Sequence, residues 1–237
     1  MPYRTRLSFL EPLFFCVLFL LIAYRISQTP DGMSDWGDTH FINYLLEHWY
    51  QSFIQFRNPL LTSFFWPHKS ALGMSTSMAL FSPYYAVFRI FYDQLVSYNL
   101  TVLAVAYTGV VSLYWAVKRL LDSRPIAILF AALYIASPVY WEQTGFVWSQ
   151  NLHAHFIPVL FLLIVLGLQS KKGLKRTLLF VLLGAGTAFI LFSESYTGIF
   201  LHIFLLLFFV FFERLSTLAI GQTLFSKKEP HYFAGFN

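Results

Sequence analysis

About six apolar stretches, each close to the ~20 residues that a helix needs to cross a bilayer, recur along this chain. They cover residues 7–24, 100–117, 125–141, 156–168, 177–192 and 198–212, and the fourth span is expected to begin within the preceding polar interval, residues 142–155. Only 11% of the 237 residues are charged and 20% are aromatic, whereas a soluble domain is about one quarter charged. Because a chain in lipid must satisfy its backbone polar groups internally, these stretches predict helices. The expected fold class is an all-α membrane protein, a multi-pass helical bundle forming a single domain over residues 1–237.

The first stretch follows a short basic start, as a signal peptide does. Tyr24, Arg25 and Ile26 stand where a cleavage site of small residues would be needed. We therefore expect an uncleaved first span. In the fifth stretch Gly184, Gly186 and Ala188 are expected to permit close packing between helices.

The positions of Lys and Arg predict the orientation, because these residues are enriched in cytoplasmic loops. With the N-terminus inside, four of the 16 Lys and Arg residues lie outside, namely Arg25, Arg57, Lys69 and Arg89. The other twelve lie inside. We expect a protein of the bacterial inner membrane with a cytoplasmic N-terminus. Residues 28–97 would form a long periplasmic loop, and residues 216–237 a cytoplasmic tail.

The long outer loop contains a stretch, residues 34–55, whose apolar side chains recur at helical spacing. One face carries Phe41, Ile42, Leu45, Leu46, Trp49 and Phe53, and the other carries His40, Asn43, Glu47 and Gln51. A helix with an aromatic-rich face beside a membrane span is suited to the lipid–water interface. A second amphipathic run is expected over residues 84–92. We therefore expect interfacial helices in this loop.

Two acids precede the helical part of this stretch and admit two interpretations. In the first, Asp38 caps the helix by accepting hydrogen bonds from its first free amides, and Asp35 is solvated. In the second, one of them is a general base that removes a proton from a hydroxyl nucleophile. The two roles can coexist. Glu142 is predicted on the same outer face, and ionisable groups gathered at a bilayer boundary favour a functional site.

A His-x-His pair, His153 and His155, follows the third span. Such a pair could ligate a metal, but positions i and i+2 of a helix do not face one way. No cofactor is expected, and a divalent metal has no support from ligand spacing. One histidine could instead contact a phosphate or orient a carboxylate, or both could be ordinary interfacial residues. In the outer loop, Arg57 and Lys69 could bind a phosphate or extend their charged ends from interfacial helices toward the headgroups.

Several function classes lack sequence support. No P-loop, G-x-G-x-x-G after a strand, G-x-S-x-G or H-E-x-x-H occurs, which disfavours nucleotide-driven transport and serine or zinc hydrolysis. Cys16 is the single cysteine, so the sequence contains no disulfide framework. The basic residues are spread between spans and form no patch for nucleic acid.

The order of several short motifs resembles the GT-C superfamily of integral-membrane glycosyltransferases. These motifs are SDWGDTHFINYLLEHWYQSF, NPLLTSFFWPHKSALG, a serine–proline step at Ser82, YNLTVL, and the later His-x-His pair. The resemblance covers roughly residues 1–212. It implies transfer of a sugar from a polyprenyl-phosphate carrier on the outer face of the membrane.

The resemblance also implies roles for individual residues. The essential acid of the first outer loop corresponds to Asp38, or alternatively Asp35, and a second acid corresponds to Glu142. His153 and His155 fall where such proteins present polar groups to the donor phosphate. Members of the family have more spans than this chain, which implies a truncated form, a second chain that supplies the missing C-terminal spans, or lost activity.

Two other functions remain open at this point. The first is a non-catalytic membrane subunit, or a flippase-like protein, that handles lipid-linked saccharides. The second is a proton-coupled transporter, which would need acids midway through its spans. Membrane lipid is an expected partner in every case.

Overall fold

The computed structural model describes residues 10–27, 38–61, 77–141, 149–171, 173–193 and 198–207, and within these ranges it is helical, without strands. The elements are α1 (Leu10–Ser27), α2 (Asp38–Ile54), α3 (Ser82–Arg89), α4 (Gln94–Leu121), α5 (Arg124–Ala136), α6 (Pro138–Trp141), the 3-10 helix η3 (Ser149–Phe156), α7 (Ile157–Gln169) and α8 (Leu174–Ser193). A short apolar helix, Gly198–Leu207, follows.

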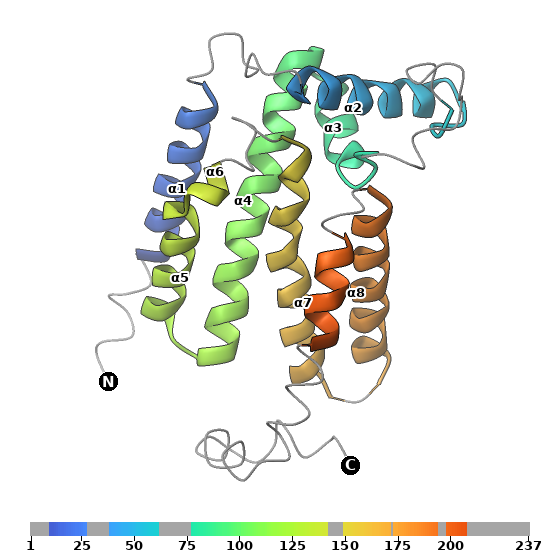
Figure 1. The fold of residues 1–237 in the computed structure, drawn as a ribbon. Coiled ribbons are helices and arrows are strands. Elements are labelled where there is room, and N and C mark those ends of the chain that lie inside the picture. Colours follow the sequence, from blue (N-terminus) through green and yellow to red (C-terminus); the bar gives the residue numbers. More distant parts are fainter. Residues whose placement is uncertain are drawn as a thin grey trace.

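The helices form a bundle around α4. In Figure 1, α1, α4, α5, α7 and α8 are roughly aligned, each opposite in direction to the one named before it, so that the neighbours α4 and α7 run the same way, and α2 lies across one end of them. α4 packs against α1, α3, α5, η3 and α7, and 61% of its most apolar segment is buried. It is therefore the central helix of the described part of the chain. The end of the bundle that carries α2 is called the α2 end below.

Three helical segments are long and apolar enough to cross a bilayer: Gln94–Leu121, Leu152–Gln169 and Leu174–Ser193. Within the other three predicted spans the described residues contain apolar helical segments of 10–17 residues, Glu11–Tyr24 within α1, Arg124–Ala136 and Gly198–Leu207, and the description stops at Leu207 in the last of them. An all-helical chain with apolar helices of membrane-spanning length is therefore the fold. That all six helices cross the bilayer stays a prediction.

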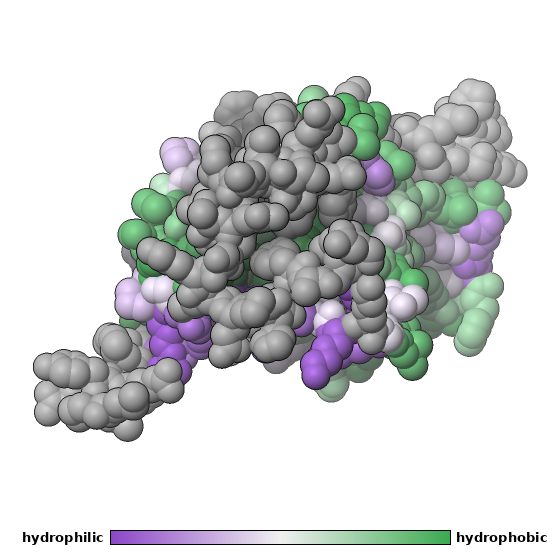
Figure 2. Space-filling model, turned by 90° about the horizontal axis from the view of Figure 1, so that it is seen from below, coloured by the Kyte–Doolittle hydropathy of each residue, from purple (hydrophilic) through white to green (hydrophobic). Residues whose placement is uncertain are grey.

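The end opposite α2 gathers the predicted cytoplasmic charges. Glu11 of α1 accepts hydrogen bonds from Lys118 Nζ at 2.8 Å and from the Tyr114 hydroxyl, and it forms an ion pair with Arg124 Nε at 3.2 Å. One carboxylate thus joins the start of α1, the last turns of α4 and the start of α5. Figure 2 looks onto this end and shows hydrophilic residues among those described there.

One of the three small residues noted in the sequence lies in the contact between α7 and α8. A Cβ atom added to Gly186 would lie 2.7 Å from Cδ2 at the end of the Leu160 side chain, so Gly186 leaves room for that side chain. Gly184 has nothing within 4 Å of such an atom, and Ala188 is exposed. The packing prediction therefore holds for Gly186 and is wrong for the other two.

Candidate functional site

The apolar face of α2 packs onto protein, which corrects the expectation that it lies against lipid. Ile42, Leu45 and Leu46 are at most 1% exposed. They share a buried cluster with Met78, Phe81 and Tyr85, with Tyr98, Val102 and Val105 of α4, and with Leu152 of η3. The periodicity was a correct indication of which side chains share a face. Because α3, α4 and η3 together present an apolar surface, protein covers the first turns of that face, whereas Phe53 near its end is 46% exposed.

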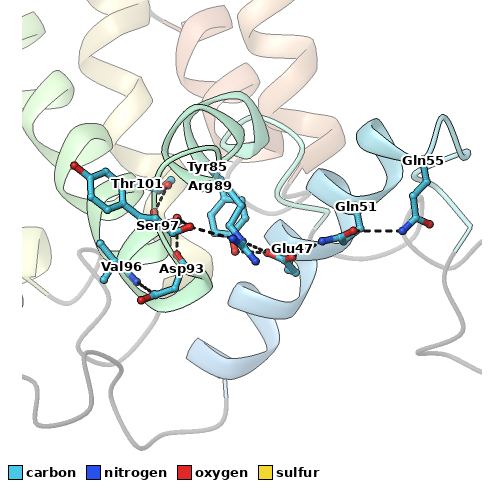
Figure 3. A network of polar contacts seen from close by, with 10 residues as sticks. Glu47, Gln51, Gln55, Tyr85, Arg89, Asp93, Val96, Ser97 and Thr101 are labelled. Atoms are coloured by element: carbon cyan, nitrogen blue, oxygen red, sulfur yellow. Dashed lines mark hydrogen bonds and ion pairs between the residues drawn. The ribbon is translucent and has the colours of Figure 1, made fainter.

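The predicted polar face of α2 is also partly buried, because α3 packs beside it. Asn43 is 4% exposed. Glu47 Oε2 accepts hydrogen bonds from the Tyr85 hydroxyl at 2.6 Å and from Arg89 Nε at 3.0 Å (Figure 3). Glu47 Oε1 accepts from Gln51 Nε2 at 2.7 Å. This carboxylate therefore joins α2 to α3.

The electrostatics of this contact favour a charged Glu47 beside a neutral Tyr85. Burial by itself raises the pKa of the Glu47 carboxyl, but the hydrogen bonds from Gln51, Tyr85 and Arg89 outweigh it, so the pKa lies below its ordinary value. Burial, followed by the neighbouring carboxylate, raises the pKa of Tyr85 far above its usual range. Tyr85 therefore remains a hydrogen-bond donor, and Arg89 is occupied by Glu47.

A second connection ties α2 to the end of α8. Trp49 Nε1 donates to the Ser77 carbonyl at 2.6 Å, and the Ser77 amide donates to the Ser193 carbonyl at 2.8 Å. The Leu80 amide donates to Ser193 Oγ at 3.1 Å. Residues 77–80 thus fix the middle of α2 to the last residue of a helix that is long enough to span a membrane.

The His-x-His segment lies inside the bundle, below α2. Both His153 and His155 are fully buried. The His153 ring packs on Phe81, with the ring centroids 4.5 Å apart. The His155 Nδ1 atom is hydrogen-bonded to the Tyr134 hydroxyl at 3.0 Å, and its Nε2 atom has no partner among the described residues. The two imidazoles therefore face different neighbours, and neither is open to the surface.

Gly109 of α4 sets the position of His155, and sequence reasoning missed it. A Cβ atom at residue 109 would lie 2.7 Å from the His155 carbonyl oxygen and 3.2 Å from its Cβ. Only glycine lets η3 approach α4 this closely. A glycine in the middle of an apolar helix was the available signal, because it lowers helix stability and needs a packing reason.

The acids predicted for catalysis are only partly described. Asp38 is the first residue of α2, and its side chain lies outside the described part of the structure. One turn later, Ile42 shares a buried cluster with Leu152, so the start of α2 lies near η3. Asp35, Glu142 and Lys69 are among the residues that are not described. The structure therefore brings the Asp38 backbone and the His-x-His segment to the same end of the bundle.

Arg57 does not lie near the start of α2 or the His-x-His segment. It is exposed and follows the C-terminal end of α2. The axis of α2 between Asp38 and Ile54 is about 24 Å long at the helical rise per residue. Arg57 therefore cannot bind the same small group as an acid at the other end of α2.

The start of α2 suits a carboxylate. The free amides and the dipole at a helix N-terminus favour negative charge there. A carboxylate at this position can accept a hydrogen bond from an incoming hydroxyl. Among the described residues, no group of three or more His, Cys, Asp and Glu side chains could hold a metal ion.

The chain was compared with protein-family models, with curated proteins and with solved structures. None of the three comparisons found a match.

Proposed function

We propose that this protein is a membrane glycosyltransferase that moves a sugar from a polyprenyl-phosphate donor to an acceptor hydroxyl on the α2 side of the membrane. One observation carries the proposal. The start of α2, which begins at Asp38, lies at the end of an apolar bundle, and α2 packs against the η3 helix that carries the His-x-His pair. Sugar transfer at a membrane surface needs an acid at the end of the membrane-spanning helices, where lipid headgroups would lie.

In this proposal Asp38 acts as the general base. It accepts the proton of the acceptor hydroxyl while the hydroxyl oxygen attacks the anomeric carbon of the donor sugar. The bond between that carbon and the phosphate oxygen breaks, and polyprenyl phosphate leaves with the electron pair. Asp35 is the alternative base, and Glu142 is a second acid on the same side. The six apolar helices all cross the bilayer, with the N-terminus in the cytoplasm.

The departing phosphate needs a positive or hydrogen-bonding partner. Three basic residues of the outer loop come into question. Arg89 is occupied by Glu47, with a side chain 27% exposed, and Arg57 lies at the far end of α2. We therefore propose that Lys69 binds the departing phosphate. The buried positions of His153 and His155 favour a supporting role beneath the site over direct contact with the donor.

The test uses the full-length protein in vesicles with undecaprenyl phosphate carrying a radiolabelled hexose, and measures label transferred to envelope saccharides. Asp38→Asn should reduce transfer at least about 100-fold, the usual contribution of general-base catalysis. Asparagine also supports a helix start, so α2 should remain folded. The matched control is Asp93→Asn at the same end of the bundle. Asp93 accepts a hydrogen bond from the Val96 amide at 2.8 Å as the cap of α4, a role that asparagine keeps.

Retained transfer in both Asp38→Asn and Asp35→Asn would refute general-base catalysis by either acid. If wild-type protein transfers no label but moves the labelled lipid across the vesicle membrane, the lipid-handling function replaces the proposed one.

A further inference from the structure

The C-terminal end of α2 differs from the rest of the helix in exposing its apolar residues. Phe53, Ile54 and Phe56 are 46%, 53% and 98% exposed, whereas Leu45 and Leu46 are buried. The ring of Phe53 packs beside Trp49, with the ring centroids 5.7 Å apart. This exposed group, Phe53 to Arg57, is called the α2 tip.

The backbone of the α2 tip is held by hydrogen bonds. The Arg57 amide donates to the Ser52 carbonyl at 2.9 Å, and the Phe56 amide donates to the Phe53 carbonyl at 3.3 Å. Phe56 has a φ angle of 51°, a left-handed conformation that is unfavourable for an aromatic residue. The turn thus directs the phenyl ring of Phe56 away from the protein, leaving it almost wholly uncovered.

The level of the α2 tip is fixed relative to α8. Trp49, one turn before Phe53, donates a hydrogen bond to the Ser77 carbonyl, and the Ser77 amide donates one to the carbonyl of Ser193, where α8 ends. In Figure 1 this end of α2 extends past α3 on the side of α8. α8 is long enough to span a bilayer, so its end would lie at a membrane boundary, and the hydrogen bonds through Ser77 hold Trp49, one turn before the α2 tip, close to that end.

The outward face of α8 is apolar up to this point. Only 22% of its most apolar segment is buried, and its exposed side chains include Val181, Leu182, Phe189, Leu191 and Phe192. In a membrane this face is covered by lipid chains. The α2 tip exposes further aromatic and aliphatic side chains, and Arg57 beside them is also exposed, the combination that residues at a bilayer boundary carry.

We propose that the α2 tip inserts into the bilayer beside the end of α8, with Phe53, Ile54 and Phe56 among the lipid chains and Arg57 among the headgroups. α2 is then held by protein along its first turns and by lipid at its end. This surface is independent of sugar transfer, since it would anchor the helix whatever reaction occurs at the other end.

The test places a fluorescent label at single positions of the full-length protein in vesicles of phosphatidylcholine and phosphatidylglycerol. Cys16→Ser removes the native cysteine, and Phe56→Cys provides the attachment site for an NBD label. Leu182→Cys on the exposed face of α8 is the control for lipid. His40→Cys is the control for water, because His40 is exposed at the other end of α2. Phe56 makes little contact with protein, so its replacement should leave the fold intact.

We expect spin-labelled lipids to quench the label at positions 56 and 182 and to leave position 40 unaffected, with blue-shifted emission at 56 relative to 40. Iodide in the buffer should quench position 40 most strongly. The proposal is overturned if the label at 56 responds to iodide and to lipid quenchers as position 40 does. It is equally overturned if position 182 is not quenched by lipid, because α8 would then not mark the membrane level.

Discussion

Replacing Glu47 with glutamine should loosen the packing of α2 on α3. The carboxylate receives hydrogen bonds from Tyr85, Arg89 and Gln51, and Glu47→Gln keeps the shape but removes the charge. The amide nitrogen of glutamine would also face one of these donors. The apolar residues of α2 stay in place, so the variant tests the polar contact alone.

The expected free-energy effect of Glu47→Gln follows from the burial of the Glu47–Arg89 ion pair. Hydrogen bonds to charged groups contribute about 1.5–3 kcal/mol, and exposed ion pairs about 0–1 kcal/mol. The side chains of Arg89 and Glu47 are 27% and 17% exposed, which lies between these situations. We expect Glu47→Gln to lower the free energy of local opening of α2 by about 1.4 kcal/mol, which is about a tenfold change in the opening equilibrium.

Hydrogen–deuterium exchange of the full-length protein in detergent measures this opening directly, in peptides from residues 38–54. Exchange should be about tenfold faster in Glu47→Gln, by the same conversion. The matched control is Gln55→Ala, which removes an exposed hydrogen bond to Gln51 from the same part of the chain. In a double-mutant cycle, adding Arg89→Gln to Glu47→Gln should cost less than Arg89→Gln alone costs in the wild type. Equal exchange in Glu47→Gln and Gln55→Ala would refute the reasoning.

The same contact should respond to acid. The pKa of Glu47 is lower in the folded protein than its ordinary value of 4.5. The stabilisation is therefore fully present above pH 4.5 and is lost as the pH falls through the folded pKa. Exchange in α2 should accelerate over that range in the wild type, after correction for intrinsic exchange rates, and Glu47→Gln should show a smaller acceleration.

Two further predictions concern packing within the bundle. Gly109→Ala would place a Cβ atom 2.7 Å from the His155 carbonyl oxygen, so overpacking should lower the stability of the protein in detergent by about 1–3 kcal/mol. In the control Gly184→Ala the added Cβ atom meets nothing within 4 Å, so this variant should be neutral or stabilising. Equal melting temperatures for the two variants would contradict the prediction. Trp49→Phe removes the indole N–H that donates to the Ser77 carbonyl at 2.6 Å. Hydrogen–deuterium exchange over residues 77–82 should therefore become faster by the equivalent of about 1–2 kcal/mol. Unchanged exchange there would show that this hydrogen bond does not hold α2 to α8.

Most of the helices could be predicted from the sequence, because helix formation in apolar stretches is a local property. The periodicity of Ile42, Leu45 and Leu46 correctly indicated one helical face. The predicted third span shows where local reasoning was insufficient, because α5 ends at Ala136, before the end of the predicted span at Trp141. The fourth span was expected to begin before Phe156, and the helical segment does begin earlier, with η3 at Ser149.

The candidate site was predicted less completely. Asp38 was expected at a helix start, and α2 begins there. The burial of His153 and His155 could not be foreseen, because it depends on neighbours distant in sequence, Phe81 and Tyr134. The importance of Gly109 depends in the same way on the approach of His155, which lies 46 residues further along the chain.

By itself, the sequence determined that this protein is helical, that its helices are apolar enough for a membrane, and which side chains share a face of α2. Only the tertiary structure determined which surfaces the faces of α2 contact. The first turns of α2 pack on protein, Glu47 pairs with Arg89, and Trp49 is bonded through Ser77 to Ser193. The physical reason is that periodicity depends on residues within a few turns, whereas burial depends on the surfaces that distant segments bring together.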